Sequence, residues 1–278
     1  MAFRPLPIQL RNHFRHLMSS DLQTRYQASI QIAGQASELI KTHFRTGVSV
    51  DKKADASPVT VADRAAEELL RQEIEKRFPD DGIIGEEFGV KEGTSDYRWI
   101  LDPIDGTKSF ISDVPLFGTM VAVEREGRGL IGVVTFPGLD VSIDAMSGGG
   151  AWETLPDGTR KPAHVCKTPS LSEGLVLTTD WEGFRERNAT KQLNEVASAS
   201  WFMRTWGDCY GHYLVATGRA VAMIDARLNI WDAAALQPII EEAGGTFTDW
   251  KGTSSIDSGD GFSTNGLVLD ELLGLLNG

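Results

Sequence analysis

The stretch WILDPIDGTKSF (residues 99–110) runs from an apolar strand into two aspartates that lie three residues apart, followed at once by Gly-Thr. Pro103 keeps Asp102 out of the helical region, which predicts that the strand ends there and that the chain turns. Asp102, Asp105 and the carbonyl oxygen of Ile104 would then face one hard cation. Oxygen ligands of this kind suit Mg²⁺.

The residues that follow predict a phosphate-binding turn. Gly106 lets the backbone approach a ligand closely, and residues 107–110 would form a helical turn whose free N–H groups point at an anion. The alternative is that Asp-Pro and Asp-Gly are ordinary turn formers between two strands. Two further acidic clusters favour a site: GEE at 85–87 follows another apolar run, and WDAA at 231–234 opens a helix that ends in EAGG at 242–245.

Together these motifs resemble the inositol monophosphatase superfamily of Mg²⁺-dependent, lithium-sensitive phosphatases, from about residue 21 to the C-terminus. The resemblance implies a layered αβαβα sandwich that combines α+β and α/β parts and is usually dimeric. It implies a set of metal ligands, namely Glu86, Asp102, the Ile104 carbonyl, Asp105 and Asp232. It implies a phosphate cradle made of Asp105, Gly106 and Thr107. The motif SPVTVAD at 57–63 would supply Asp63, which together with Thr107 would orient the attacking water, and Glu86 is counted with them as catalytic.

Charge balance supports this ligand set. Four carboxylates would offset two Mg²⁺ ions, leaving a near-neutral cradle that a dianionic phosphate can enter with a third ion. Two to three Mg²⁺ per active site could lower the pKa of a bound water and stabilise both oxygens of an in-line displacement. No protein nucleophile is then required.

The composition is typical of a cytoplasmic enzyme. Of the 278 residues, 41% are hydrophobic, and no run approaches membrane-spanning length. The net charge of −12 argues against nucleic acid as a partner. Cys166 and Cys209 are too few for a disulfide framework, which fits a reducing compartment. Residues 1–20 lack the core of a secretion signal and are expected to form an extra helix or arm.

Beyond that extension we expect two lobes, residues 21–155 with the metal-binding loops and residues 156–278 completing the active site. In the first lobe, helices are expected at 22–45 and 61–78, and an antiparallel meander at 99–101, 118–124, 130–136 and 140–145. In the second lobe, strands are expected at 175–179, 220–224 and 246–250, and helices at 180–197, 208–217 and 231–243. Pro238 should kink the last helix or confine its regular hydrogen bonding to its two ends.

Within the superfamily, several segments look most like the histidinol-phosphate phosphatase branch, namely KADASPVT (53–60), GEEFG (85–89), TKSF (107–110) with PLFGT (115–119), and WGDCY (206–210). That branch performs the penultimate dephosphorylation of histidine biosynthesis. Histidinol carries an ammonium group and an imidazole, which acidic side chains near the leaving group would favour.

Asp208 and Asp225 are the candidate substrate-binding residues. Asp208 opens a helix, so an N-cap role is an equal alternative. Asp225 lies seven residues before Asp232, where the resemblance implies a grip on the organic part of the substrate. Glu87 is either a partner of Glu86 or a neighbour without direct contact.

Other functions stay open. An inositol monophosphatase would differ only around the two substrate-binding aspartates. A 3′,5′-bisphosphate nucleotidase would need extra cations for a second phosphate, and no suitable Lys/Arg cluster is expected near those residues. Some bacterial relatives instead act as non-catalytic binding factors in transcription complexes.

Several other residues receive weaker interpretations. Lys53 lies in a stretch that looks like the family's mobile active-site loop and carries a weak functional hypothesis. Gly148–Gly150 is interpreted as a turn. The side chains Trp201, Trp206, Tyr210 and Trp231 are expected to serve core or dimer packing. No histidine is expected to be catalytic.

Overall fold

Apolar residues at helical spacing bury one face of two long helices, α1 (Ile8–Lys41) and α2 (Val61–Arg77), against an eight-stranded sheet. The computed structural model describes residues 8–53 and 58–278, with side chains described from residue 20 onward. The predicted extension, residues 1–20, therefore lies partly outside the described residues. From Ile8 onward its backbone forms the first turns of α1.

The eight-stranded sheet is antiparallel except where β3 pairs with β5. Its strands, in spatial order, are β10 (Arg160–Pro162), β9 (Ala151–Thr154), β8 (Val141–Met146), β7 (Arg128–Phe136), β6 (Gly118–Arg125), β5 (Arg98–Asp105), β3 (Gly82–Gly85) and β4 (Gly89–Lys91). The predicted meander is therefore confirmed. A separate hairpin joins β1 (Val50–Lys52) to β2 (Pro58–Thr60) just before α2.

A second, five-stranded sheet belongs to the C-terminal half of the chain. Its strands, in spatial order, are β12 (Phe202–Arg204), β11 (Leu175–Thr178), β13 (Ala222–Asp225), β15 (Gly261–Thr264) and β14 (Thr246–Thr248). The first three are parallel, and β15 runs antiparallel to both of its neighbours.

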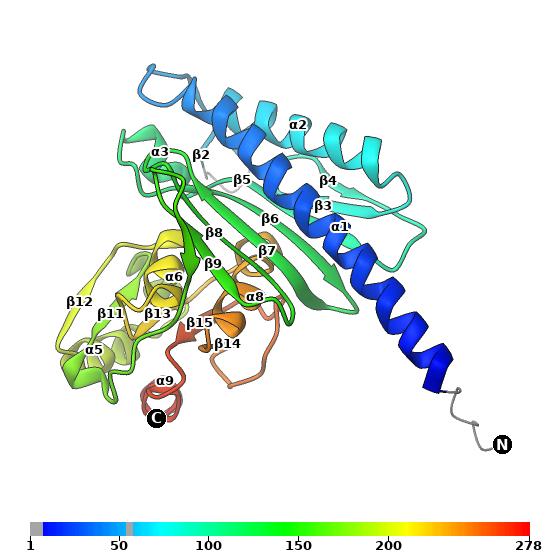
Figure 1. Cartoon of the computed structure of the whole chain (residues 1–278). Coiled ribbons are helices and arrows are strands. Elements are labelled where there is room, and N and C mark those ends of the chain that lie inside the picture. Colours follow the sequence, from blue (N-terminus) through cyan, green and yellow to red (C-terminus); the bar gives the residue numbers. More distant parts are fainter. Residues whose placement is uncertain (1–7, 54–57) are drawn as a thin grey trace.

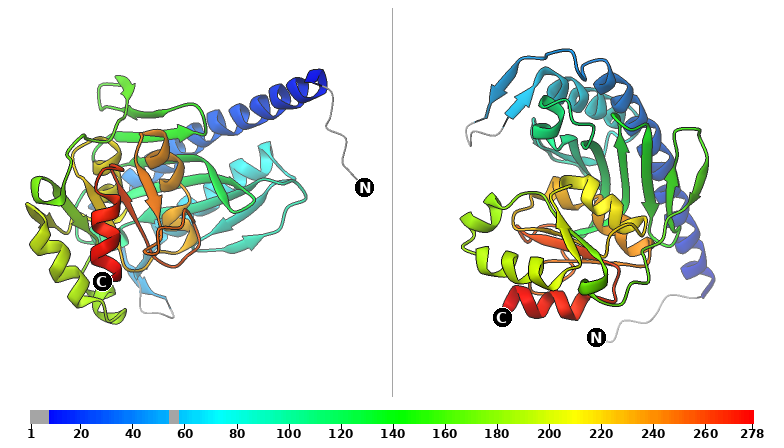
Figure 2. Two further views of the ribbon diagram at one scale, coloured as in Figure 1. Left: turned by 90° about the horizontal axis from the view of Figure 1, so that it is seen from below. Right: turned by 90° about the vertical axis from the view of Figure 1, so that its left-hand side faces the viewer.

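The remaining helices complete five layers (Figures 1 and 2). Between the two sheets lie α6 (Asp208–Ala216), α7 (Ile230–Ala233) and α8 (Leu236–Glu242). The outer face of the five-stranded sheet is covered by α4 (Glu182–Glu186), α5 (Thr190–Ala199) and α9 (Leu269–Asn277). Two short helices stand next to strands, α3 (Thr107–Ile111) after β5 and a 3₁₀ helix (Leu171–Glu173) before β11. The predicted αβαβα sandwich is confirmed.

Two helices predicted for the second lobe are divided in the structure. The single helix expected at 180–197 is wrong, because α4 ends at Glu186 and Asn188, with a φ of +59°, separates it from α5. The helix expected at 231–243 divides into α7 and α8. Pro238 has no N–H to donate to the carbonyl of Ala234, and the helix is interrupted there, as predicted.

The metal loop also differs from its prediction. The strand expected to end at Asp102 continues to Asp105, with a shift of register between the two aspartates. A proline is tolerated there because a bulge leaves backbone groups outside the regular ladder. In the described part of the chain, no helix is long and apolar enough to cross a membrane.

Candidate metal and phosphate site

The bulge in β5 decides how the first two candidate metal ligands point. In a regular strand, residues three apart face opposite sides of the sheet. Here residues 103–104 together oppose Thr119, since Asp102 and Asp105 pair with residues 120 and 118. The hydroxyl of Thr119 donates to the carbonyl of Pro103 at 2.9 Å. The extra residue brings both carboxylates to one side of the sheet.

A third carboxylate joins this pair from another layer. Carboxylate oxygens of Asp102, Asp105 and Asp232 all lie within 4.8 Å of one another. Asp232 is held in the first turn of α7, where one oxygen accepts hydrogen bonds from the N–H and side-chain amide of Asn229 at 2.7 and 3.1 Å. The Oδ1 atom of Asp102 is buried and has no hydrogen-bond partner among the described residues. Such an oxygen suits a cation.

The electrostatics of this triad also favour a cation. Burial and the neighbouring carboxylates of Glu86 and Asp105 raise the pKa of Asp102 well above its ordinary value. Burial, together with Asp208 and Asp232, does the same to the pKa of Asp105. Burial raises the pKa of Asp232 to about 7 despite the hydrogen bonds from Asn229. A divalent cation among these groups would offset their mutual repulsion.

Glu86 stands directly after β3 and beside Asp102. Its carboxylate is paired with Lys53, whose Nζ lies 2.7 Å from Glu86 Oε1 and 2.5 Å from Glu87 Oε1. Burial lowers the pKa of Lys53, but the hydrogen bonds to the two glutamates outweigh burial and raise it above its ordinary value. Lys53 therefore contacts a candidate metal ligand, and Glu87 is a partner of the same ammonium group. Residues 54–57, which include Ser57 of the predicted motif, lie outside the described residues.

A buried glutamate that the sequence analysis missed positions this loop. Glu67 of α2 accepts the backbone N–H groups of Glu87 at 2.7 Å and Phe88 at 3.2 Å, and pairs with Arg71 at 2.8 Å. A Cβ placed on Gly85 would lie 1.9 Å from Glu67 Oε1. A glycine at position 85 therefore allows the Glu67 carboxylate to lie against the backbone of β3. In the sequence, Glu67 and Arg71 look like an ordinary exposed i, i+4 pair.

Asp63 lies in the first turn of α2, as predicted. One of its oxygens accepts from the N–H and hydroxyl of Thr60 at 2.7 and 2.5 Å, which forms a capping box. The other oxygen, Oδ1, is buried without a partner among the described residues. Burial raises the pKa of Asp63 despite the Thr60 contacts, and the nearby Glu86 carboxylate adds to this. One carboxylate oxygen thus remains available for a water.

The predicted phosphate turn has the expected backbone. Gly106 adopts φ +85° at the N-cap of α3, and a Cβ there would lie 3.0 Å from Asp208 Oδ2. Thr107 begins the helix, and its hydroxyl donates to the carbonyl of Ile104 at 3.0 Å. That carbonyl keeps one lone pair for a cation.

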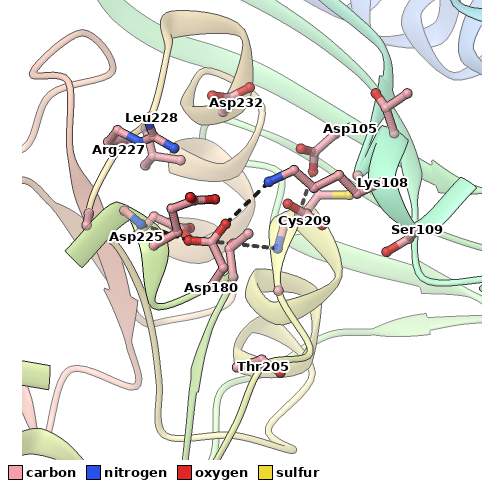
Figure 3. Close-up of a pocket in the computed structure, with 18 of the residues that line it drawn as sticks. Asp105, Lys108, Ser109, Asp180, Thr205, Cys209, Asp225, Arg227, Leu228 and Asp232 are labelled. Carbon is pink, nitrogen blue, oxygen red and sulfur yellow. Dashed lines mark hydrogen bonds and ion pairs between the residues drawn. The ribbon is translucent and has the colours of Figure 1, made fainter. Parts of the chain in front are cut away.

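A cavity of about 1460 Å³ opens from this turn and is bounded by both halves of the chain (Figure 3). Among the described residues it is lined by eight carboxylates, those of Glu86, Asp105, Asp180, Glu182, Glu186, Asp208, Asp225 and Asp232. Its cationic side chains are Lys108, Arg185 and Arg227. The cavity wall therefore carries an excess of negative charge.

These three cations lie in the cavity with Asp208 and Asp225, near which no suitable Lys/Arg cluster was expected, and folding brings Lys108 and Arg185 in from other segments. Each is already paired: Lys108 with Asp180 at 3.6 Å, Arg185 with Glu182 at 3.0 Å, and Arg227 with Glu186. Figure 3 shows Lys108 reaching across the cavity to Asp180. These pairs leave little positive charge for a second phosphate.

The structure contradicts the N-cap alternative for Asp208. Gly207 occupies the N-cap of α6, and no side chain caps that helix end. Asp208 itself has a φ of +53°, held where its N–H donates to Thr179 Oγ1 at 2.8 Å. Burial, then repulsion from Asp225 and Asp232, raises the pKa of Asp208 to about 7. Its carboxylate faces the cavity beside the phosphate turn.

Asp225 ends β13 and is buried in the cavity wall. Its Oδ1 accepts from the hydroxyl of Thr179 at 2.6 Å, and its Oδ2 lies 3.0 Å from Nε2 of His212. His212 also lines the cavity. The sequence analysis gave no histidine a role at the site, although His212 lies one helical turn after Asp208 and therefore shares its face.

The remaining weaker interpretations have mixed outcomes. Trp206 is not a core residue, since it is 42% exposed and lines the cavity, and Trp201 is 69% exposed. Tyr210 and Trp231 pack against the core between the sheets, as expected. The glycine run at 148–150 forms a turn, as expected. The N–H groups of Gly148 and Gly150 donate to the Glu242 carboxylate at 2.7 and 2.8 Å.

Comparison with known proteins places this geometry in a family. The sequence model of the inositol monophosphatase family matches residues 21–274. A histidinol-phosphatase from Chlorobaculum parvum is 42% identical over 245 residues, 88% of this chain and 91% of the relative. A histidinol-phosphatase from Mycobacterium tuberculosis is 32% identical over 250 residues, 90% of this chain and 96% of the relative. An IMPase from Thermotoga maritima superposes with a TM-score of 0.82 at 30% identity, covering 91% of this chain and 97% of its own.

The fold and the family match define a phosphatase: the chain belongs to the inositol monophosphatase family. It is a phosphoric monoester hydrolase, and its substrate is a phosphate monoester. The predicted resemblance is confirmed.

Proposed function

We propose that this enzyme hydrolyses L-histidinol phosphate to L-histidinol and phosphate, a reaction of histidine biosynthesis, with Mg²⁺ as its cofactor. One observation carries the substrate assignment: beyond the phosphate turn, the cavity presents Asp208 and Asp225 in a wall with excess negative charge. An ammonium group and an imidazole suit such a wall better than a neutral polyol does. The names of the relatives from Chlorobaculum parvum and Mycobacterium tuberculosis support the same substrate.

The donor set fits Mg²⁺. Buried carboxylate oxygens converge within 4.8 Å, and Asp102 Oδ1 has no partner among the described residues. Hard oxygen ligands of this kind suit Mg²⁺. The residues proposed to hold two to three ions are Glu86, Asp102, the Ile104 carbonyl, Asp105 and Asp232. When bound, the ions would supply Lewis-acid stabilisation of phosphate oxygens and make a water nucleophilic at neutral pH.

The chain's own groups would orient the reactants. Asp63 Oδ1, which has no hydrogen-bond partner in the described part of the chain, and the hydroxyl of Thr107 would hold the attacking water, with Glu86 close by. Asp105, Gly106 and Thr107 would cradle the phosphate, since the positive φ of Gly106 directs the N-terminus of α3 at it. Lys53 would have to release Glu86 before that carboxylate binds metal.

The organic part of the substrate would be held on the other side of the cavity. Each carboxylate oxygen of Asp225 has one contact within the protein, to Thr179 or to His212. The remaining lone pairs of these oxygens would accept hydrogen bonds from an ammonium group in the cavity. Asp208 lies between this anchor and the phosphate turn. We further propose a cytoplasmic homodimer whose subunits each contain the two lobes, residues 21–155 and 156–278.

The decisive experiment measures phosphate release by the purified protein with Mg²⁺. L-histidinol phosphate, myo-inositol 1-phosphate and adenosine 3′,5′-bisphosphate are compared at matched concentrations, with a chelator as the metal-free control. A clear preference for histidinol phosphate supports the proposal. A preference for inositol phosphate would leave the metal site standing and overturn the substrate.

A non-catalytic role in a transcription complex makes a different prediction. Asp105→Asn would then preserve the cellular function, whereas an enzymatic role requires its loss. Histidine auxotrophy of a deletion strain, complemented by the wild-type gene and not by the variant, distinguishes the two.

A further inference from the structure

His212 is a buried imidazole in the cavity wall to which the proposed reaction gives no task. It is 1% exposed and lies on α6, on the same face as Asp208. Its Nδ1 lies 2.8 Å from the hydroxyl oxygen of Ser263, and its Nε2 lies 3.0 Å from Asp225 Oδ2. Both ring nitrogens are therefore occupied by side chains from two neighbouring strands, β15 and β13.

The chemistry of the partners fixes where the imidazole carries its proton. A carboxylate can only accept hydrogen bonds, so Nε2 must donate to Asp225. In the neutral ring Nδ1 is then an acceptor, and the Ser263 hydroxyl can donate to it. Ser263 is fully buried, and its hydroxyl contacts His212. The Asp225 carboxylate thus fixes the tautomer, and the Ser263 hydroxyl, which can donate or accept, holds the other nitrogen of the ring.

Asp225 is held from its other sides as well. Thr179 donates its hydroxyl to Asp225 Oδ1 at 2.6 Å and accepts the N–H of Asp208 at 2.8 Å. The indole of Trp250 donates to the backbone carbonyl of Asp225 at 3.0 Å. One hydrogen-bonded chain therefore runs from Ser263 through His212, Asp225 and Thr179 to the backbone N–H of Asp208, beside the phosphate turn.

We propose that His212 is a positioning residue that sets substrate specificity by orienting the Asp225 carboxylate toward the cationic leaving group. Without the Nε2 donor, the carboxylate could rotate about its last torsion or turn toward water. The inference rests on the proposed function, in which Asp225 anchors the organic part of the substrate. In this proposal His212 acts through Asp225 and does not contact the substrate.

The test measures kcat and KM with L-histidinol phosphate and with p-nitrophenyl phosphate for two variants. His212→Leu removes both nitrogens, whereas the amide of His212→Gln can still donate to Asp225. We expect the ratio of kcat/KM for the two esters to fall about tenfold or more in His212→Leu, mainly through a higher KM for histidinol phosphate. The glutamine variant should recover most of that ratio. The exposed His164→Leu is the matched control.

Each outcome decides the matter. An unchanged ratio in His212→Leu, or an equal loss with both esters, overturns the proposal, the latter because it indicates general damage. If His212→Leu does not fold, Ser263→Ala must lower the ratio in the same direction by a smaller factor, and no change overturns the proposal. If the wild type shows no preference for histidinol phosphate, the proposed substrate fails; the same comparison, made with the ester that it does prefer, then decides the role of His212.

Discussion

Asp102 and Asp105 present carboxylate oxygens within 4.8 Å of each other, although they are three residues apart on one strand. A regular strand would send them to opposite faces of the sheet. The bulge at residues 103–104 removes that separation at the point where the strand meets α3. A candidate metal pair and a candidate phosphate turn are thereby built from six consecutive residues.

This pair gives the first prediction. Asp102→Asn should lower phosphate release at least about a hundredfold, because it removes a buried anionic ligand that the proposed cations require. Mg²⁺ should raise the melting temperature of the wild type, since it offsets repulsion among buried carboxylates, and should raise that of the variant less. Phosphate assays and thermal melts with and without Mg²⁺ check both parts. The exposed Asp96→Asn is the control, and wild-type rates in Asp102→Asn would sink the metal assignment.

A second prediction concerns the phosphate turn. Gly106→Ala should destabilise the protein by about 1 kcal/mol through its φ of +85° and should also raise KM, since the new Cβ would lie 3.0 Å from Asp208 Oδ2. Gly158→Ala separates the two effects, because Gly158 has a φ of +81° with open space around it. If both variants showed the same KM, crowding at the phosphate turn would have no role.

The third prediction tests recognition of the leaving group. Asp225→Asn keeps the shape of the side chain and removes its charge, so kcat/KM for histidinol phosphate should fall about tenfold or more. The value for p-nitrophenyl phosphate should change much less, because that ester has no ammonium group. The exposed Asp257→Asn should behave as the wild type. Parallel losses with both esters would argue that Asp225 serves the fold alone.

The fourth prediction concerns the loop that carries Glu86. Glu67→Ala removes the acceptor for two partly buried loop N–H groups and the buried counter-ion of Arg71. We expect a higher Mg²⁺ concentration for half-maximal activity and a loss of about 1–3 kcal/mol of stability. Glu68→Ala, one residue along the same helix and exposed, is the matched control. Magnesium titrations of activity measure the first effect, and an unshifted titration would contradict it.

The fifth prediction is a dependence of stability on pH at a distance from the site. Asp81 is buried, and Arg25 holds it with two hydrogen bonds of 2.8 Å. Burial raises its pKa, but the hydrogen bonds from Arg25, Ser95 and Trp99 outweigh burial and lower it below 3.8. The ionised form therefore stabilises the fold above the ordinary pKa, and this contribution is lost as pH falls through the lowered one.

Asp81→Asn should accordingly cost about 1–3 kcal/mol at pH 7, because the partly buried Arg25 loses its counter-ion. The difference from the wild type should shrink as pH falls below 3.8. Urea unfolding at several pH values measures it, with the exposed Asp80→Asn as control. If the difference in unfolding free energy between the two proteins stays constant with pH, the ion pair between Asp81 and Arg25 is not the source of the lost stability.

The sequence by itself determined the family, the layered fold, and the residues that approach one another within single motifs. The run at residues 99–110 needs only its own strand, proline and glycine to build a cation and anion site, because its parts are close in the chain. Local signals were likewise sufficient to place Asp63 in the first turn of α2 and to predict the interruption before Pro238, since a helix start and a missing N–H act over one helical turn.

Only the tertiary structure decided which distant residues share the cavity. His212 reaches Asp225 and Ser263 because α6 packs between the two sheets, and Lys108 meets Asp180 across two halves of the chain. Glu67 is an interior anchor rather than a surface charge because Gly85 lets a strand pass against it. These contacts depend on packing between layers, which no periodicity or spacing within a segment specifies.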